Sequence, residues 1–342
     1  MQQYSTSASS TIAGLYTMSL RLVVGWTYFS AFWRRMILSN KLDPDTTGYI
    51  GEKFNHFLPN ALGIKPLIEY LVSHPESLWW AMFLFTLIEA VTGFLLILGF
   101  MTRLMSISVI ILATGILLGA GWLGTTCLDE WQIGVLGLAA GFTIFFSGGG
   151  EYSIDQYLKR YAWGRHRIVQ WLASGELNLQ PGTLKKLVIG TSFLVVFATL
   201  GTNQYFHGGV WGTLHNKSVR PELEIDNVSI KDAILSFYLQ RIEGADVYGS
   251  FLISIALANS EGNILFNMEW DTLANLSEKN IHNLYVGQIK PGKHSLIVPL
   301  GAKARITIED DRLRYISTKG EVMLVITDIS GAVWKKSVYL SK

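Results

Sequence analysis

The sequence predicts an α-helical membrane bundle followed by an all-β domain, and three observations support this. The chain of 342 residues is 49% hydrophobic and 16% charged, with a mean hydropathy of +0.30, whereas soluble domains carry about a quarter charged residues. Long apolar stretches occur only before residue 202. After it the apolar segments are short and rich in β-branched residues. A basic run with interleaved aromatics is absent, which argues against a nucleic-acid binder.

Five apolar stretches are candidates for membrane-spanning helices, each of which needs roughly 20 residues. They cover residues 12–33, 78–100, 104–123, 131–146 and 184–200. Residues 1–11 hold no Lys or Arg, so we expect the first stretch to be a retained helix rather than a secretory signal. The long loop of residues 34–77 contains the amphipathic stretch "IKPLIEYLVSH". We expect short helices there that pack over the mouth of the bundle, as a functional lid or a purely structural cover.

Short strands are expected beyond residue 202. The segments "GSFLISIALAN", "HSLIVPLG", "KARITIED", "VMLVITDI" and "VWKKSVYL" are bounded by turn signals such as "EGN", "PGK" and "SGA". This spacing predicts an antiparallel β-sandwich. The expected organisation is a four-helix bundle over residues 1–160, a cytoplasmic link and fifth spanning helix over residues 161–201, and a β-sandwich over residues 202–342.

Basic residues predict the orientation in the membrane. The link between the fourth and fifth helices carries Lys159, Arg160, Arg165, Arg167, Lys185 and Lys186, which places it in the cytoplasm. The N-terminus is then inside, and the 34–77 loop and the β-domain are outside, on the periplasmic face of the inner membrane. Arg34 and Arg35 oppose this rule, because they follow the first helix on its outer side.

Two charges lie within the apolar helices. Arg21 is about nine residues and Glu89 about eleven residues from the same end of the bundle, so their depths differ by about 3 Å and we expect them to pair. A lone charge at mid-membrane costs about 2.5–3.5 kcal/mol, which a hydrogen-bonded partner reduces. The pair has two interpretations: a structural lock on the helix register, or a polar site that binds a head group or moves a proton.

Several stretches carry a resemblance to known families. The stretches "LRLVVGWTYFSAFWRR", "IEAVTGFLLILGFMTR", "EWQIGVLGLAAG" and "GGGEYSIDQYL" resemble DoxD, a member of the DoxX-like four-helix membrane family. The stretches "GGVWGTLHNKS", "DVYGSFLISIALAN" and "IHNLYVGQIKPG" resemble DoxA. DoxD and DoxA are the two subunits of thiosulfate:quinone oxidoreductase, so the resemblance implies that this chain fuses them.

The resemblance implies an enzyme that joins two thiosulfate ions into tetrathionate and passes two electrons to a membrane quinone, either ubiquinone or menaquinone. Thiosulfate is a dianion, and the planar fork of arginine suits an oxyanion. Arg34 and Arg35 are therefore the expected substrate ligands, one facing the bundle and the other the lipid head groups. Ordinary interfacial snorkelling is the alternative.

Cys127, the single cysteine, lies in "TTCLDEWQ" on the expected substrate side. Its thiolate could carry a sulfur adduct as a covalent catalyst. Asp129 and Glu130 would raise the pKa of this thiol unless Arg34 or Arg35 offsets their charge. The alternative is an inert small residue at the start of a helix.

The segment after the fifth helix offers further substrate-binding candidates, His207 and Lys217 in "NQYFHGGVWGTLHNKS". His207 and His215 have no third ligand near them in the sequence, so a metal site is not predicted there. A plain linker with interfacial aromatics is the alternative. The sequence contains no metal motif and no flavin-binding fingerprint.

For the quinone we expect Arg21 and Glu89, with Trp26 and Trp131 as stacking walls and Gln132 as another polar group. Quinone reduction takes two protons, which Glu89 could relay as the second catalytic residue. Packing or an interfacial aromatic belt is the alternative role of the tryptophans.

Two other functions stay open at this point. One is a non-catalytic membrane anchor for a β-sandwich that binds a partner, and the other is a thiol- or sulfur-handling protein without a quinone. The bilayer, thiosulfate and a quinone are the expected partners, and the sequence leaves a homodimer open.

Overall fold

The computed structural model describes residues 12–121, 130–162, 164, 166–175, 177, 179–214, 220–244, 250–316 and 321–340. The chain forms two compact units. The first contains the described parts of residues 1–50, 79–122 and 126–215. The second contains residues 51–78 and the described parts of residues 216–342.

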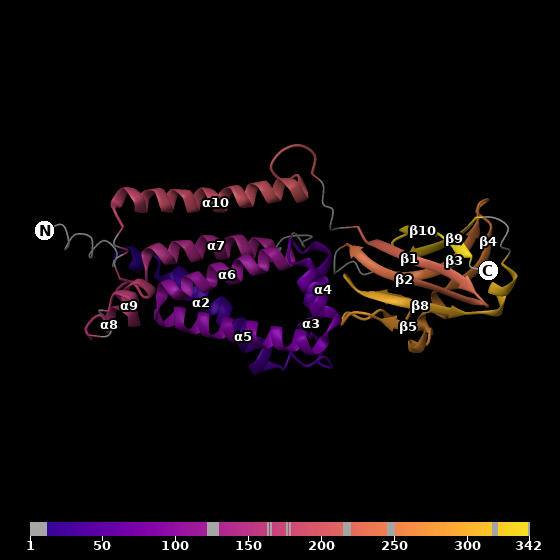
Figure 1. Ribbon diagram of the computed structural model, residues 1–342, viewed down its shortest axis with the longest axis horizontal. Helices are drawn as coiled ribbons and strands as arrows, with labels where there is room; N and C mark the ends of the chain where they lie inside the picture. Colours follow the sequence, from indigo (N-terminus) through magenta and orange to yellow (C-terminus); the bar gives the residue numbers. More distant parts are fainter. Residues whose placement is uncertain are drawn as a thin grey trace. The chain divides into compact units, whose positions relative to one another are not determined.

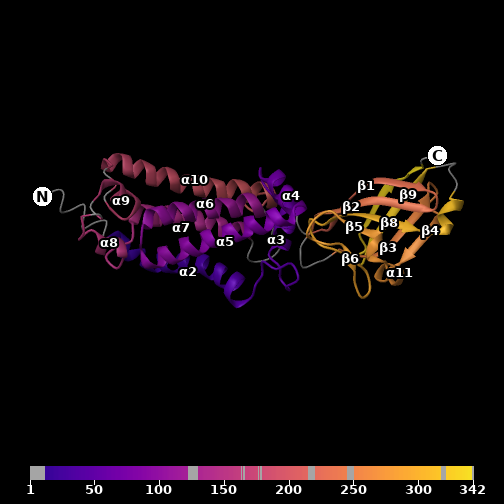
Figure 2. The ribbon, with the colours of Figure 1, turned by 60° about the horizontal axis from the view of Figure 1, so that its bottom comes forward.

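The first unit is helical. Figures 1 and 2 show α2, α5, α6 and α7 side by side, with α10 along α7. In chain order these elements are α2 (Met18–Phe32), a π-helical turn η1 (Trp33–Leu38), α5 (Pro75–Leu98), α6 (Thr102–Ala120), α7 (Glu130–Ser147), the short α8 (Ile154–Leu158) and α9 (Arg167–Leu172), and α10 (Pro181–His207). The bundle core consists of Tyr28, Leu96, Met105, Val109, Leu112 and Ile144.

Three of the described helices are long and apolar enough to cross a membrane: α5, α6 and α10, of 24, 19 and 27 residues. α7 is a shorter apolar helix of 18 residues. The first predicted span begins as a helix at Ile12, is interrupted at Thr17, and continues through α2 into η1. All five predicted stretches are thus helical in the described residues, and the chain is a membrane protein.

The described residues of the second unit form two β-sheets and several short helices. One sheet has the strand order β11-β1-β2-β8-β5, and the other has the order β10-β9-β3-β7-β6, with β4 also paired to β3. The strands are β1 (Glu222–Lys231), β2 (Ile234–Glu243), β3 (Ser250–Asn259), β4 (Ile264–Glu269), β5 (Ile281–Asn283), β6 (Lys290–Pro291), β7 (Leu296–Val298), β8 (Lys303–Glu309), β9 (Val322–Asp328), β10 (Val333–Ser337) and β11 (Tyr339–Leu340). The short elements between them are α11 (Trp270–Ala274), η4 (Glu278–Asn280) and η5 (Asp311–Tyr315).

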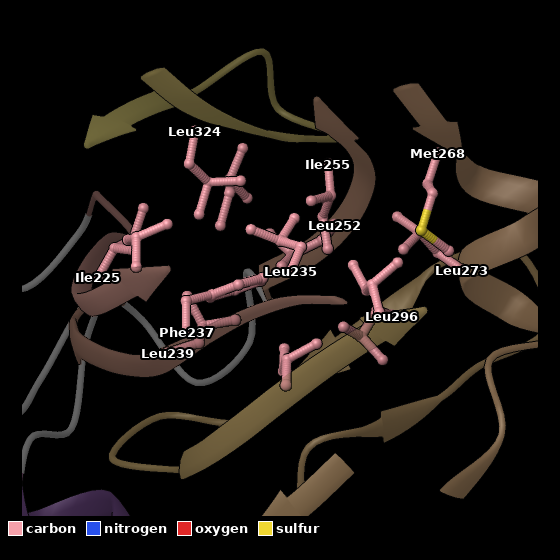
Figure 3. Close-up of a cluster of buried hydrophobic side chains, with 14 of the residues drawn as sticks. Ile225, Leu235, Phe237, Leu239, Leu252, Ile255, Met268, Leu273, Leu296 and Leu324 are labelled. Atoms are coloured by element: carbon pink, nitrogen blue, oxygen red, sulfur yellow. The ribbon is translucent and has the colours of Figure 1, made fainter. Parts of the chain in front are cut away.

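Alternating side chains of the strands fill the β-domain core. β2 buries Leu235, Phe237 and Leu239 at every second position, as a strand with one covered face requires. These side chains lie with Leu252 and Leu324 of the other sheet in one cluster (Figure 3). Each fully buried side chain of this kind contributes about 1.5–3 kcal/mol. The predicted membrane bundle followed by a mainly antiparallel β-domain is confirmed.

The 34–77 loop contains three short elements: α3 (Gly51–Phe57), η2 (Leu58–Asn60) and α4 (Lys65–Ser73). The prediction of short helices in this loop is confirmed, and "IKPLIEYLVSH" forms α4. Residues 51–78 belong to the second unit rather than to the helical one. They therefore pack with the β-domain, although in the sequence they lie between the first two helices of the bundle.

Candidate functional site

Glycines set the register between α2 and α5. A Cβ at Gly25 would lie 2.9 Å from the carbonyl oxygen of Gly93, and a Cβ at Gly93 would collide with the backbone of Gly25 and Phe29. The two helices therefore touch backbone to backbone at this level, which small residues permit in membrane bundles. α2 and α5 run antiparallel and meet at Gly25 and Gly93. Residues later in α2 therefore lie beside residues earlier in α5.

This register places Arg21 at the C-terminal end of α5. Its guanidinium donates to the carbonyl oxygens of Leu96, Ile97 and Tyr152 at 2.8, 2.7 and 2.8 Å. The last carbonyls of a helix lack a full set of intrahelical partners and carry partial negative charge. Arg21, which is 2% exposed, caps α5 and ties it to the chain just before α8.

The predicted pair of Arg21 with Glu89 is wrong. Glu89 lies seven residues before Leu96, which is about 10 Å along the helix axis. The prediction assumed that the start of the first helix and the end of the second lie at the same depth. Instead the first helix starts beyond the end of α5. Arg21 is already level with Leu96 and Ile97, so the helical residues before it extend past α5. Arg21 therefore has a structural role as a cap on α5, and neither interpretation of the predicted pair applies to it.

Other buried charges at this end of the bundle are also capped. The Asp155 carboxylate accepts hydrogen bonds from the backbone N–H groups of Met101 and Thr102 at 2.7 and 2.9 Å, at the start of α6. Arg103 donates to the carbonyl oxygens of Phe145, Trp171 and Gly175. These contacts fasten α6, α7 and α9 together, so the charges at this end serve the fold.

The candidate site lies toward the other end of the bundle, where Glu89 pairs with Arg35. An Arg35 Nη1 hydrogen donates to Glu89 Oε2, and Nη1 also lies 3.5 Å from Thr86 Oγ1. Glu89 and Thr86 are 3% and 1% exposed. Each charge reduces the cost of burying the other in an apolar bundle. The buried carboxylate thus supplies a physical reason for an arginine directly after the first predicted span.

The local backbone brings the arginine to the carboxylate. Arg34 and Arg35 both lie in η1, where the helix widens into a π-helical turn. Such turns shift the side-chain register of a helix and are frequent at functional sites. Arg35 is turned into the bundle, whereas Arg34 is exposed and bonds the Ser30 carbonyl oxygen at 3.3 Å. The expectation that one arginine faces the bundle is met by Arg35.

Two more groups surround the carboxylate. Tyr28, which is buried on α2, and Arg34 both lie within electrostatic range of Glu89. α7 lies beside Tyr28, because a Cβ at Gly137 would lie 3.3 Å from Tyr28 Oη. The sequence gives no periodic or spacing signal for Tyr28 or Thr86, so both were missed as neighbours of Glu89.

The other predicted quinone-binding residues, Trp26, Trp131 and Gln132, do not surround Arg21. Thr17 Oγ1 donates to Ser147 Oγ at 2.8 Å, and Tyr28 lies beside Gly137, so α7 runs antiparallel to α2. Trp131 and Gln132 are then level with η1 and the Arg35–Glu89 pair, far from Arg21. Trp131 is buried and Gln132 is half-buried. Trp26 is 56% exposed on the outer surface of the bundle and does not line its interior.

The remaining predicted residues are not joined to the pair by any described contact. Cys127, Asp129, His215 and Lys217 lie outside the described residues. Glu130 begins α7, and His207 ends α10, where Gly208 adopts a left-handed conformation. Among the residues that the structure describes, no group of three or more His, Cys, Asp or Glu side chains could hold a metal ion.

Comparison with protein families matches both halves of the chain. Residues 16–180 match the family model described as TQO small subunit DoxD. Residues 206–337 match the model described as TQO small subunit DoxA. The order of the two matches is the order that the sequence resemblance predicted. The chain therefore belongs to the DoxD family through its helical half and to the DoxA family through its β-domain, two TQO small-subunit families joined in one polypeptide.

Proposed function

We propose that this chain is a thiosulfate:quinone oxidoreductase whose chemistry takes place around the Arg35–Glu89 pair. The observation that carries the proposal is the pair of a buried carboxylate on α5 with a half-buried arginine on a π-helical turn, in a membrane bundle of the DoxD family. Arg21, Arg103 and Asp155 have evident structural partners. The Arg35–Glu89 pair lies away from this group of helix caps and combines an anion-binding group with a proton-transfer group.

The reaction balances without any further reactant. The sulfane sulfurs of two thiosulfate dianions form one S–S bond, which gives tetrathionate and releases two electrons. A quinone takes up these two electrons and two protons and becomes a quinol. The site must therefore hold an oxyanion, admit a quinone from the bilayer and deliver protons.

Arg34 and Arg35 are suited to the oxyanion. Arg34 is exposed, and the Arg35 side chain is 21% exposed, so both can meet an anion from the aqueous side of the helix end. Glu89, at 5% side-chain exposure, is suited to proton delivery toward the quinone. When an anion draws the Arg35 guanidinium away, the Glu89 carboxyl group is released from its partner and can exchange a proton with the quinone. Substrate binding would thereby prepare the proton donor.

Cys127 is the proposed covalent catalyst. Its thiolate and the sulfane sulfur of one thiosulfate would form a cysteinyl thiosulfonate as two electrons pass to the quinone. The sulfane sulfur of a second thiosulfate would then attack the sulfane sulfur of this adduct, which forms tetrathionate and releases the cysteine thiolate. Trp131 and Gln132, four and five residues further along the chain, would line the quinone side, and His207 and Lys217 would supply further groups for the anion.

The proposed orientation places this end of the bundle and the β-domain on the periplasmic side of the inner membrane. It rests on the basic residues of the segment before α10, among them Lys159, Arg160 and Arg167, which favour the cytoplasm. The domain boundaries proposed from the sequence, at residues 160 and 201, fall within this segment and within α10.

The test is reduction of a soluble quinone analogue by the purified protein with thiosulfate as the only electron donor. We expect thiosulfate-dependent reduction that falls by about 10²–10⁴-fold in Glu89→Gln, as for loss of a proton-transfer group, and strongly in Arg35→Gln. Arg167→Gln, which changes an exposed arginine outside the site, is the matched control and should keep the parent rate.

Cys127→Ala separates the two routes. Loss of reduction would support the covalent adduct, and retention would discard the thiol and leave direct oxidation at the arginines. A folded parent that reduces none of several quinones would refute the oxidoreductase and leave a membrane-anchored binding module.

A further inference from the structure

We infer that residues 51–78 are a docking segment, which binds the DoxA-type domain and holds it to the helical half without help from the covalent linker. By sequence this segment lies within the DoxD match, residues 16–180. By packing it belongs to the unit that contains the β-domain. A part of one family's fold is thus built into the structure of the other family's domain.

A buried asparagine is the polar centre of the contact. Asn55 of α3 is 0% exposed. Its Nδ2 donates to the carbonyl oxygen of Leu300 at 3.1 Å, and its Oδ1 accepts from the Gly287 N–H at 3.3 Å. Both partners are backbone groups of β-domain loops, so the amide pairs with groups that would otherwise lack a partner. Such satisfied polar groups fix the orientation of a contact.

Two glycines of the β-domain are shaped to receive α3. A Cβ at Gly301 would collide with the Asn55 backbone carbonyl, and a Cβ at Gly287 would collide with the Asn55 side chain. Gly301 also has a φ of +76°, which disfavours other residues. The close approach of the two backbones therefore depends on glycine at these positions.

An apolar cluster surrounds the asparagine. Leu58, Ile68 and Val72 of the segment are 1%, 3% and 0% exposed and pack against Tyr285 of the β-domain. Phe54, Phe57, Ala61, Ile64, Leu284 and Val286 cover the edges of this cluster. This is a separate core from that of the sandwich, and it is formed only when the segment and the domain are together.

Two further hydrogen bonds join α4 to the same loop. The Tyr285 hydroxyl donates to Glu69 Oε1 at 2.7 Å, and the Val286 N–H donates to the Val72 carbonyl oxygen at 3.0 Å. The loop itself is held by Asn283, whose side chain bonds both backbone groups of Ile289 at 3.0 and 2.8 Å. A preformed loop with a buried apolar centre and a polar rim has the composition of a specific protein interface. The partner that fits the docking segment is a DoxA-type domain, whether fused or supplied as a second chain.

The experiment cuts the linker and asks whether the halves stay together. A specific protease site is inserted after Gly212, an exposed position between α10 and β1, in the full chain with an N-terminal affinity tag. After cleavage in detergent and in lipid nanodiscs, the tagged half is purified by size exclusion. We expect the β-domain fragment to remain bound in the parent protein.

Variants on both sides of the contact locate it. Val72→Asp places a charge in the apolar cluster from the helical half, and Gly301→Ala adds a side chain that meets Asn55 from the β-domain. Each should weaken retention by about a hundredfold or more, because a buried unpaired charge or a backbone collision has no local remedy. The released fragment should keep the β-sheet circular dichroism spectrum of a folded sandwich.

Each variant has a matched control. Leu67→Asp makes the same change on the exposed face of α4, where Leu67 is 57% exposed. Gly262→Ala puts alanine at a similar φ of +86° in the β3–β4 turn, where a Cβ meets nothing within 4 Å. Both should retain the fragment. Release of the domain from the cleaved parent, retention in both Val72→Asp and Gly301→Ala, or equal release from the controls would each overturn the inference. None of these outcomes depends on quinone reduction, so the docking segment and the proposed enzyme can fail separately.

Discussion

Two arginines of the bundle, one buried and one half-buried, have different uses at the residue scale. Arg21 donates to three backbone carbonyl oxygens and caps α5, whereas Arg35 pairs with a carboxylate. The partners of Arg21 are backbone carbonyl oxygens, which do not titrate and which occupy its guanidinium. The pair of Arg35 with Glu89 contains a carboxyl group that can bind a proton and a guanidinium that can bind a substrate anion. The two arginines should therefore respond differently to substitution.

Arg21→Met tests the structural role. Methionine fills similar space but leaves the carbonyl oxygens of Leu96, Ile97 and Tyr152 without their charged donor. We expect the free energy of unfolding in detergent to fall by about 2–3 kcal/mol, the value of a buried hydrogen bond to a charged group. Quinone reduction per folded molecule should stay at the parent level. A variant with parent stability and lost reduction would instead place Arg21 in the reaction.

The sequence identifies these charges but not their partners. Arg21 and Glu89 stand out because a charge in an apolar helix is rare. Which groups they meet depends on the depth at which each helix starts, and apolar stretches do not define that depth to within two turns. The contact of Gly25 with Gly93 fixes it. Small residues such as these two glycines predict a close approach of helices, but they do not say which residues meet or at what depth. The partners of Cys127 lie outside the described residues.

At the element scale, the contact between α2 and α5 decides the site. Backbone contact at Gly25 and Gly93 aligns the π-helical turn η1 with the part of α5 that bears Glu89 and Thr86. The turn then aims Arg35, but not Arg34, into the bundle. Types of element were largely predictable from the sequence. β1 and β2 lie outside the segments that the sequence predicts as strands, although β2 alternates buried and less buried side chains.

Gly93→Ala tests the helix contact. The added methyl group meets the backbone of Gly25 and Phe29, so α2 and α5 must separate. We expect a loss of about 1–3 kcal/mol in the free energy of unfolding, as for overpacking of a well-packed core. The control is Gly115→Ala in α6, where a Cβ meets nothing within 4 Å. It should leave stability within about 1 kcal/mol of the parent and favour the helix. Equal losses in both variants would argue against a special contact at Gly93.

At the scale of the whole molecule, the docking segment connects two parts of the chain that are distant in sequence. The sequence predicted helices in the 34–77 loop and a cover over the bundle mouth. It could not predict that Asn55, Leu58 and Val72 pack with the β-domain, because the receiving loops lie more than two hundred residues away. Amphipathic helices show that a face is buried, not what buries it.

The pH dependence of docking follows from Tyr285. Burial and the hydrogen bond to Glu69 raise the pKa of the Tyr285 phenol above its ordinary value of about 10. The docked state therefore holds the phenol proton more tightly than the undocked state, and this contribution is complete below pH 10 and is lost as the pH rises above it. In the cleaved protein, retention of the β-domain should fall as the pH rises above about 10. Tyr285→Phe should show a smaller fall, and an identical fall in both proteins would remove Tyr285 as the cause.

The docking segment also bears on how many helices cross the membrane. A loop and a domain that touch must lie on the same side of the bilayer, so the chain must cross an even number of times between residue 78 and residue 222. In the described part of that interval, the long apolar helices α5, α6 and α10 make an odd number. α7 supplies the missing crossing: its 18 residues span about 27 Å, close to the thickness of the hydrocarbon layer. A contact between soluble segments thus identifies a short membrane helix that its own length leaves undecided.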